Sequence, residues 1–257
     1  MSNLFDLTGK VAIVTGSSRG IGEAIAKRMA QHGAKVVVSS RKPEACEAVA
    51  KEINTEYGNG KEVATVIACN IAEKNQLQEL IDKTIAKWGR LDILVSNAAV
   101  NPYYGPSRDI PDDAFDKVMA CNVRSNHWLC HMAAPHLAKQ GGGSIIIISS
   151  IGGLRGSLQL GTYAISKAAD IALARNIARE YGEQNIRANC ILPGLIKTYF
   201  AKALWENPET LTRATSTSAL KRIGEPDEIA GAAVFLASSA GAFTTGASIV
   251  IDGGVVC

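Results

Sequence analysis

Short apolar runs alternate with helical patterns along this chain of 257 residues, and the alternation limits the folds open to it. The runs are nearly continuously apolar, which is typical of parallel strands covered by helices on both faces. We therefore expect an α/β fold in which one doubly wound domain spans residues 1–257, with right-handed crossovers. Strands are expected near residues 10–15, 35–39, 63–69, 92–96, 144–149, 186–192 and 247–251, and helices near 21–32, 43–57, 73–88, 112–138, 162–182 and 226–238.

A glycine-rich turn joins the first expected strand to the first expected helix. Residues 15–22 read TGSSRGIG, with glycines at 16, 20 and 22. Such a turn lets the backbone approach a pyrophosphate, and the helix N-terminus adds free N–H groups and a partial positive charge. The spacing differs from the Gly-x-Gly-x-x-Gly of the commoner fingerprint. The turn predicts a dinucleotide site in a Rossmann-type domain.

Tyr163 and Lys167 stand four positions apart on an expected helix, and Ser150 follows the apolar run 145–148. Positions four apart share one helix face. A tyrosine normally has a pKa of about 10, and a nearby ammonium favours the phenolate. Such a tyrosine can pass a proton to or from a substrate oxygen, so these residues are candidates for catalysis.

Together these motifs resemble those of the short-chain dehydrogenase/reductase family, from about residue 7 to residue 254. The matching positions are Thr15-Gly16-x-x-x-Gly20-x-Gly22, Asn122, Ser150, Tyr163, Lys167 and Pro193-Gly194. The resemblance implies a seven-stranded parallel sheet in the order 3-2-1-4-5-6-7. It also implies hydride transfer between a nicotinamide and a carbonyl or alcohol carbon, without a metal.

The resemblance implies a role for each member of a catalytic tetrad. Tyr163 would protonate the developing alkoxide, and Ser150 would orient the carbonyl. Lys167 would hold the nicotinamide ribose and lower the pKa of Tyr163. Asn122 would fix a water that links Lys167 to bulk solvent. The implied cofactor-binding residues are Gly16, Ser18, Arg19, Gly20, Ile21, Gly22, Ser40, Arg41, Asn70, Ile71, Asn97, Ala98, Tyr163, Lys167, Pro193, Gly194, Ile196 and Thr198.

Two positions depart from the family pattern. Ala99 stands where glycine is usual after the fourth strand, so the backbone there is expected to shift slightly. Asn70 replaces the acidic residue that normally contacts the adenine amino group. Because an amide oxygen can accept the same hydrogen bond, we expect only a modest effect on affinity.

The second expected strand ends in residues that favour NADP(H) over NAD(H). NAD sites usually place a carboxylate there for the ribose 2′-hydroxyl, whereas this chain has Ser40 and Arg41. A planar guanidinium suits a 2′-phosphate. Arg19 adds a second cation in the glycine turn.

Residues 195–222 interrupt the alternation directly after the Pro-Gly turn, and we interpret them as a substrate lid. Aromatic and apolar residues in the lid and after the fourth strand predict an apolar substrate pocket, although they could instead pack into the core or a subunit contact. The candidates are Tyr103, Tyr104, Phe200, Leu204 and Trp205.

The leading hypothesis is an NADPH-dependent carbonyl reductase, similar to the family branch that reduces retinal and aromatic ketones and to tropinone-reductase-like enzymes. A 3-oxoacyl-[acyl-carrier-protein] reductase shares every catalytic motif, and a basic rim could bind its acidic carrier. Lys197, Lys202, Lys221 and Arg222 could form that rim. A non-catalytic NADP sensor is a third hypothesis, against which the intact tetrad argues.

The composition limits the classes of partner that this chain can bind. A net charge of +3 implies neither nucleic acid nor an anionic membrane. No apolar stretch approaches a membrane span, and no secretory signal is visible, so a cytoplasmic location is expected. The six scattered cysteines indicate no disulfide scaffold, and His127 and His131 lack a third metal ligand. Small residues in the helix after Tyr163 permit close helix packing, and the resemblance implies that this helix pairs between subunits. We therefore expect a homotetramer, and a small molecule as substrate.

Overall fold

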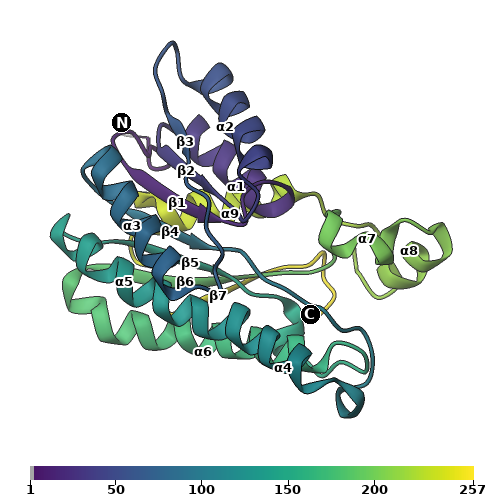
Figure 1. Cartoon of the computed structure of the whole chain (residues 1–257). Coiled ribbons are helices and arrows are strands. Elements are labelled where there is room, and N and C mark those ends of the chain that lie inside the picture. Colours follow the sequence, from purple (N-terminus) through teal and green to yellow (C-terminus); the bar gives the residue numbers. More distant parts are fainter. Residues whose placement is uncertain (1–2) are drawn as a thin grey trace.

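The computed structural model describes residues 3–257 and contains one seven-stranded sheet in which all strands run parallel. The strand order is β3-β2-β1-β4-β5-β6-β7, as the resemblance implied. The strands are β1 Val11–Thr15, β2 Lys35–Ser39, β3 Ala64–Val66, β4 Ile93–Ser96, β5 Gly143–Ile148, β6 Ile186–Pro193 and β7 Ser248–Ile251. Helices cover both faces of this sheet (Figure 1). The α/β prediction is therefore confirmed.

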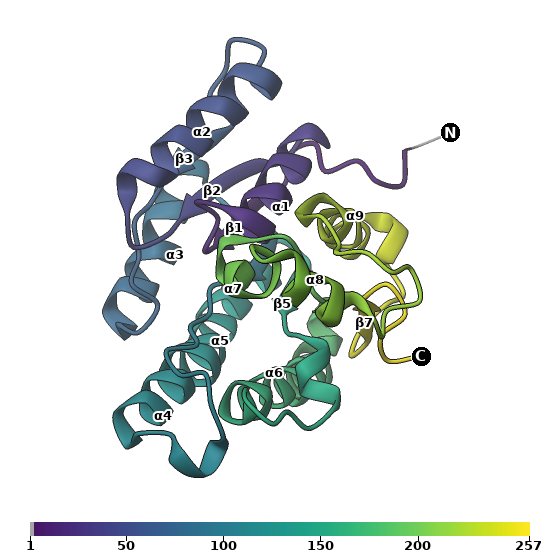
Figure 2. The same cartoon turned by 90° about the vertical axis from the view of Figure 1, so that its right-hand side faces the viewer.

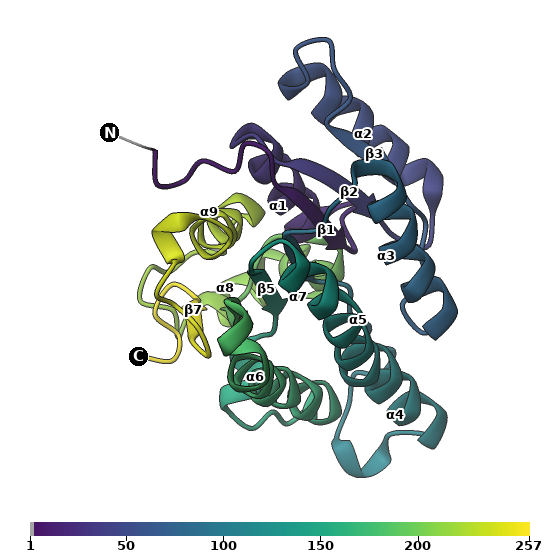
Figure 3. The same ribbon diagram turned by 90° about the vertical axis from the view of Figure 1, so that its left-hand side faces the viewer.

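The helices were also largely predictable from apolar spacing. They are α1 Gly20–Gln31, α2 Pro43–Tyr57, α3 Lys74–Trp88, α4 Asp112–Val118, α5 Ser125–Lys139, α6 Gly161–Tyr181, α7 Lys202–Trp205, α8 Pro208–Thr215 and α9 Pro226–Ala237. The views in Figures 2 and 3 show α1 beside α9 at one face, with α5 and α6 at the other.

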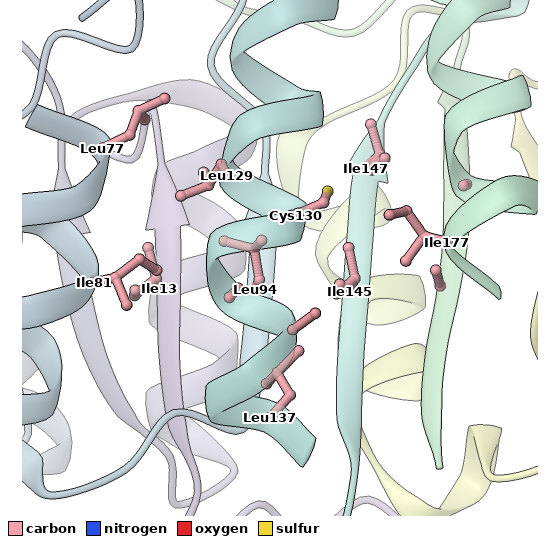
Figure 4. Packing of buried hydrophobic residues seen from close by; sticks show 14 of the residues in the cluster. Ile13, Leu77, Ile81, Leu94, Leu129, Cys130, Leu137, Ile145, Ile147 and Ile177 are labelled. Atoms are coloured by element: carbon pink, nitrogen blue, oxygen red, sulfur yellow. The ribbon is translucent and has the colours of Figure 1, made fainter. Parts of the chain in front are cut away.

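Two apolar cores lie on the two faces of the sheet, because successive strand residues point in opposite directions. Ile13, Leu94 and Ile145 pack against α3, α5 and α6, and Figure 4 shows this cluster from close by. Ala12 and Val14 face the other way, toward α1, α2 and α9. Burial of both faces explains why the strands read as continuous apolar runs.

The single helix expected over residues 112–138 is interrupted. Between α4 and α5 the backbone forms a π-helical segment, Met119–Arg124, and Asn122 lies within it. π-Segments inside α-helices are uncommon and occur often at functional sites. Apolar periodicity does not reveal such a segment, because the helical pattern continues through it.

The segment expected to form a lid folds into a 3₁₀ turn at Tyr199–Ala201 followed by α7 and α8. A short β-bridge between Ile196 and Gly224 closes its base. In Figure 1, α7 and α8 project from one end of the sheet. Among the residues described, 3–257, no helix is both long and apolar enough to cross a membrane.

Candidate active site

A cavity of about 1330 Å³ lies at the carboxyl ends of the strands. Thr15, Ser39, Asn97, Ser150 and Pro193 line it, and each stands at or just after the end of a different strand. Open α/β sheets bind ligands at this edge. The lid lies over the same edge in Figure 2 and supplies part of the wall.

Nearly all of the site residues expected from the sequence meet in this cavity. All eighteen residues expected to bind the cofactor line it, as do Ser150, Tyr104, Phe200 and Leu204. Asn122, Tyr103 and Trp205 are not part of its wall. One cavity therefore joins the expected nucleotide site to Ser150, Tyr163 and Lys167.

The glycine turn has the geometry that a pyrophosphate requires. Gly16 and Gly20 have φ of +65° and +62°, in the left-handed region that favours glycine. A Cβ at Gly16 would lie 2.9 Å from the Cα of Ala98, so the turn tolerates no side chain there. Arg19 occupies the N-cap of α1 without a side-chain cap, which leaves the N–H groups of the first helical turn for an anion. These residues fit a dinucleotide.

Two side chains, Asn97 and Ser17, hold the turn in this shape. Asn97 donates from Nδ2 to the carbonyl oxygens of Thr15 (2.8 Å) and Gly16 (3.1 Å). The Ser17 hydroxyl donates to the Val14 carbonyl (2.6 Å) and accepts from the Ser39 amide (2.9 Å). Sequence reasoning missed Ser17, because a serine in a glycine turn gives no signal of its long-range partner.

The nucleotide end of the cavity is positively charged. Arg41 and Ser40 line it where a carboxylate would serve NAD. Within the described residues the wall contains no Asp or Glu; its charged members are Arg19, Arg41, Lys42, Lys117, Arg155, Lys167 and Arg213. Arg19 also stacks on the lid, with its guanidinium carbon 4.3 Å from the centre of the Tyr199 ring. This contact joins the glycine turn to the lid and was not expected from the sequence.

Ala99 does not need the left-handed backbone conformation that glycine favours, and the slight backbone shift expected there stays a prediction. The non-glycine residues with positive φ among those described are Asn59, Asn185 and Lys221, so φ of Ala99 is not positive. Asn70 lines the cavity, but its Oδ1 accepts a hydrogen bond from the Ala72 amide (3.3 Å). The oxygen expected to reach an adenine therefore already has one partner.

Tyr163 and Lys167 lie on α6 and reach the cavity together with Ser150. The Lys167 Nζ is 5.7 Å from the centre of the Tyr163 ring. It donates to the Ile148 carbonyl (2.9 Å) and to Asp170 Oδ2 (2.9 Å). The ammonium is therefore held under the tyrosine at the end of β5.

Burial raises the pKa of Tyr163, and this outweighs the lowering by the Lys167 charge and the Ser150 hydroxyl. The expected direction of the lysine's effect is present, but the net pKa lies above the ordinary value. Burial alone would lower the pKa of Lys167, but Asp170 and Tyr163 raise it, so the net direction is upward. At neutral pH Tyr163 is a phenol and Lys167 an ammonium, which is the protonation state of a proton donor.

Of the two adjacent serines, Ser150 is better placed for catalysis. Its hydroxyl accepts from the Gly152 amide (3.0 Å) and retains a hydrogen to donate. The Ser149 hydroxyl is buried and donates to the Lys167 carbonyl (2.7 Å). The hydroxyl hydrogen of Ser149 is therefore not available to a substrate oxygen.

Ser150→Ala is expected to lower kcat/KM for carbonyl reduction by about 10²-fold or more, because it removes a donor aimed at the developing oxyanion. Ser149→Ala should lower the melting temperature while leaving kcat/KM nearly unchanged. Steady-state kinetics and thermal unfolding of both variants make the comparison. Equal kinetic losses would show that Ser150 is not the oxygen-binding serine.

The Asn122 side chain does not line the cavity but forms hydrogen bonds with two other segments of the protein. Its amide accepts from the Val100 N–H (2.8 Å) and donates to the Val100 carbonyl (2.9 Å) and to Ser166 Oγ (3.1 Å). It is fully buried. The side chain thus ties the segment after β4 to α6, and the role of Asn122 in fixing a water stays a prediction.

The lid contributes some of the expected apolar wall. Phe200 lies with its ring 5.9 Å from that of Tyr163, and Leu204 and Tyr104 also line the cavity. Trp205 instead donates from its indole to the Thr198 carbonyl (2.8 Å), which fastens α7 within the lid. Tyr103 folds back to the Pro106 carbonyl (3.3 Å). An aromatic residue in a loop indicates an apolar contact but not its direction.

His127 and His131 lie next to each other on α5, with ring centres 4.4 Å apart. His131 Nδ1 is 2.8 Å from the Tyr181 hydroxyl. Among residues 3–257 no cluster of three or more His, Cys, Asp or Glu side chains could hold a metal ion.

Comparisons with known proteins agree with this geometry. A family model described as enoyl-(acyl carrier protein) reductase matches residues 16–256. The bovine protein named dehydrogenase/reductase SDR family member 4 is 42% identical over 248 residues, 96% of this chain and 88% of that protein. Its human counterpart of the same name is 40% identical with the same coverage.

Two solved structures are similar along nearly the whole chain. A 7α-hydroxysteroid dehydrogenase complexed with NADH and 7-oxo glycochenodeoxycholic acid has 38% identity and a TM-score of 0.92, with 99% of this chain and 98% of that chain covered. A gluconate 5-dehydrogenase from Burkholderia cenocepacia in complex with NADP and tartrate has 30% identity and a TM-score of 0.92, with 98% and 97% covered. The chain is an oxidoreductase and belongs to the short-chain dehydrogenase/reductase family, whose members use nicotinamide cofactors.

Proposed function

We propose that this enzyme reduces bulky apolar ketones or aldehydes with NADPH. One observation carries the proposal: a single cavity joins the anion-binding glycine turn and Arg41 to the Ser150–Tyr163–Lys167 group. The nicotinamide, when bound, would supply a hydride to the carbonyl carbon. Tyr163 then gives its phenolic proton to the carbonyl oxygen, Ser150 donates a hydrogen bond to that oxygen, and Lys167 stabilises the tyrosinate that remains. A proton from solvent restores the phenol.

The two similar structures hold different cofactors, NADH in one and NADP in the other, so they do not decide between the two. The residues of this chain favour NADP(H). A carboxylate for the ribose 2′-hydroxyl is missing from the described wall, while Arg41 and Arg19 line it. Guanidinium groups bind phosphate through paired, charge-assisted hydrogen bonds. We therefore keep the proposal of NADPH as the physiological cofactor.

The substrate end of the cavity supports an apolar substrate. Phe200, Leu204, Tyr104 and Leu158 line the cavity, and the Phe200 ring lies 5.9 Å from that of Tyr163. Apolar surface that a ligand removes from water contributes about 25 cal/mol per Å². The proposed carrier-protein reductase gains less support, because two cations of its expected rim are paired: Lys202 with Glu206 (3.1 Å) and Arg222 with Glu228 (2.6 Å).

A panel of aromatic ketones, alicyclic ketones, α-dicarbonyls and short 3-oxoacyl thioesters, assayed with NADPH, tests the proposal. We expect the highest kcat/KM for the aromatic and alicyclic ketones. Phe200→Ala should raise KM for an aromatic ketone about 10-fold, given about 1.5–3 kcal/mol for a buried large apolar side chain. NADPH affinity should stay nearly constant. If the thioesters are the best substrates, the function of a carrier-protein reductase replaces this proposal. If no compound of the panel is reduced, the hypothesis of a non-catalytic NADP sensor replaces it.

The homotetramer stays a prediction. Ala168 and Ala172 are exposed on α6, where a second helix could approach closely. A small-molecule carbonyl remains the proposed partner, and a cytoplasmic location is likewise proposed.

A further inference from the structure

A buried carboxylate that the catalytic scheme does not use lies against the catalytic lysine. Asp170 follows Lys167 by one turn of α6, and its Oδ2 is 2.9 Å from the lysine Nζ. The Asp170 side chain has an exposed fraction of 0% and the Lys167 side chain 2%. Charged groups are rarely buried this fully unless they are paired. The pair is therefore a specific feature of the site.

A chain of hydrogen bonds fixes the carboxylate from its other side. Asn126 of α5 donates from Nδ2 to Asp170 Oδ1 (2.8 Å), and the Ser96 hydroxyl at the end of β4 donates to Asn126 Oδ1 (2.6 Å). Asn126 and Ser96 are both buried. This row of hydrogen bonds thus ends inside the protein, so it cannot carry a proton to solvent. Asp170 can act on the site only through its position and its charge.

That charge acts on both members of the proton-donating pair. Burial disfavours the Lys167 ammonium, and the adjacent carboxylate offsets this. The same carboxylate disfavours the Tyr163 phenolate, which is the product of proton donation to a substrate. Because the tyrosine and the lysine are coupled, their first proton leaves as a property of the pair. A neighbouring anion delays that loss to higher pH, whichever group releases the proton.

The two cysteine thiols around Asp170 carry no charge near neutral pH. The Cys190 thiol of β6 donates to the Asp170 carbonyl (3.3 Å), and burial raises the pKa of Cys190 to about 12. Burial also raises the pKa of the Cys130 thiol on α5. Both thiols stay neutral where the enzyme would be assayed.

We propose that Asp170 is a positioning residue of this site: its buried carboxylate holds the Lys167 ammonium beneath Tyr163 and keeps the Tyr163–Lys167 pair fully protonated, and so competent for carbonyl reduction, at alkaline pH. The proposal rests on the proposed carbonyl reduction. It gives the reductive direction a wider pH range than Tyr163 and Lys167 alone would support.

Asp170→Asn tests the proposal, since the amide oxygen can still accept from Lys167 while the charge is lost. We expect the alkaline limb of the kcat/KM profile for ketone reduction to move to lower pH by about one to three pH units, the range for a charge at this distance. Asp92→Asn is the matched control: it is another buried carboxylate, paired with Arg90 (2.6 Å), at the amino end of β4 and outside the cavity wall. Its alkaline limb should coincide with that of the parent.

A second measurement needs no turnover. Potentiometric difference titration of the cofactor-free proteins should show Asp170→Asn releasing up to one more proton than the parent between neutral pH and pH about 10. An inactive parent would defeat the proposed function, and this titration would still decide the role of Asp170. Matching proton release and matching alkaline limbs in variant and parent would overturn the inference. If Asp170→Asn does not fold, Asp170→Ser removes the same charge and is measured in the same way.

Discussion

Tyr163→Phe is expected to lower kcat for ketone reduction by about 10²- to 10⁴-fold, the usual contribution of a positioned proton donor. The substitution removes one hydroxyl and leaves the ring beside Phe200 and above the Lys167 ammonium. The hydride donor is unaffected, but the alkoxide that forms on the substrate no longer has an adjacent acid. Residual turnover would depend on Ser150 and water.

The binding of NADPH separates a catalytic loss from a structural one. Fluorescence titration should give a dissociation constant within a few-fold of the parent's, because Lys167 and the glycine turn are unchanged. Tyr181→Phe is a matched control: Tyr181 also lies on α6, but its hydroxyl contacts His131 and is remote from the cavity wall. Its kcat should equal the parent's. If Tyr163→Phe retained kcat within a few-fold, Tyr163 would not be the proton donor.

The parts of this site that the sequence predicts well are those encoded by contiguous residues. The strand, glycine turn and helix from β1 to α1 follow from local spacing, because glycine adopts the left-handed conformation found at positions 16 and 20 at the lowest cost. The sheet follows from continuous apolar runs, each buried on two faces. The ends of the strands then determine where the cavity must lie.

The parts that the sequence did not predict depend on side chains distant along the chain. Asn126 and Asp170 are 44 residues apart, and neither carries a pattern that points to the other. An acidic residue one turn after Lys167 was visible, since positions three apart are neighbours on a helix. Its importance comes from burial, which α5 and β6 impose. Trp205 shows the same limit, because its indole turns toward Thr198 rather than toward the substrate.

Arg41→Asp is expected to reduce the preference for NADPH over NADH, measured as the ratio of the two kcat/KM values, by about 10- to 100-fold. Hydrogen bonds to charged groups contribute about 1.5–3 kcal/mol each, and the new carboxylate would repel a 2′-phosphate. NADH has a hydroxyl at that position, which a carboxylate can bind. NADH activity should therefore stay constant or rise while NADPH activity falls.

The position of Arg19 and a matched control variant make this test specific to Arg41. Arg19 remains in the variant, but its guanidinium stacks on Tyr199, so it should replace only part of the lost interaction. Lys51→Asp is the matched control, since it makes the same change of charge on the exposed face of α2, away from the cavity wall. It should leave the ratio unchanged. An unchanged ratio in Arg41→Asp would mean that Arg41 does not reach the ribose and that the choice of NADPH depends on other cations of the wall.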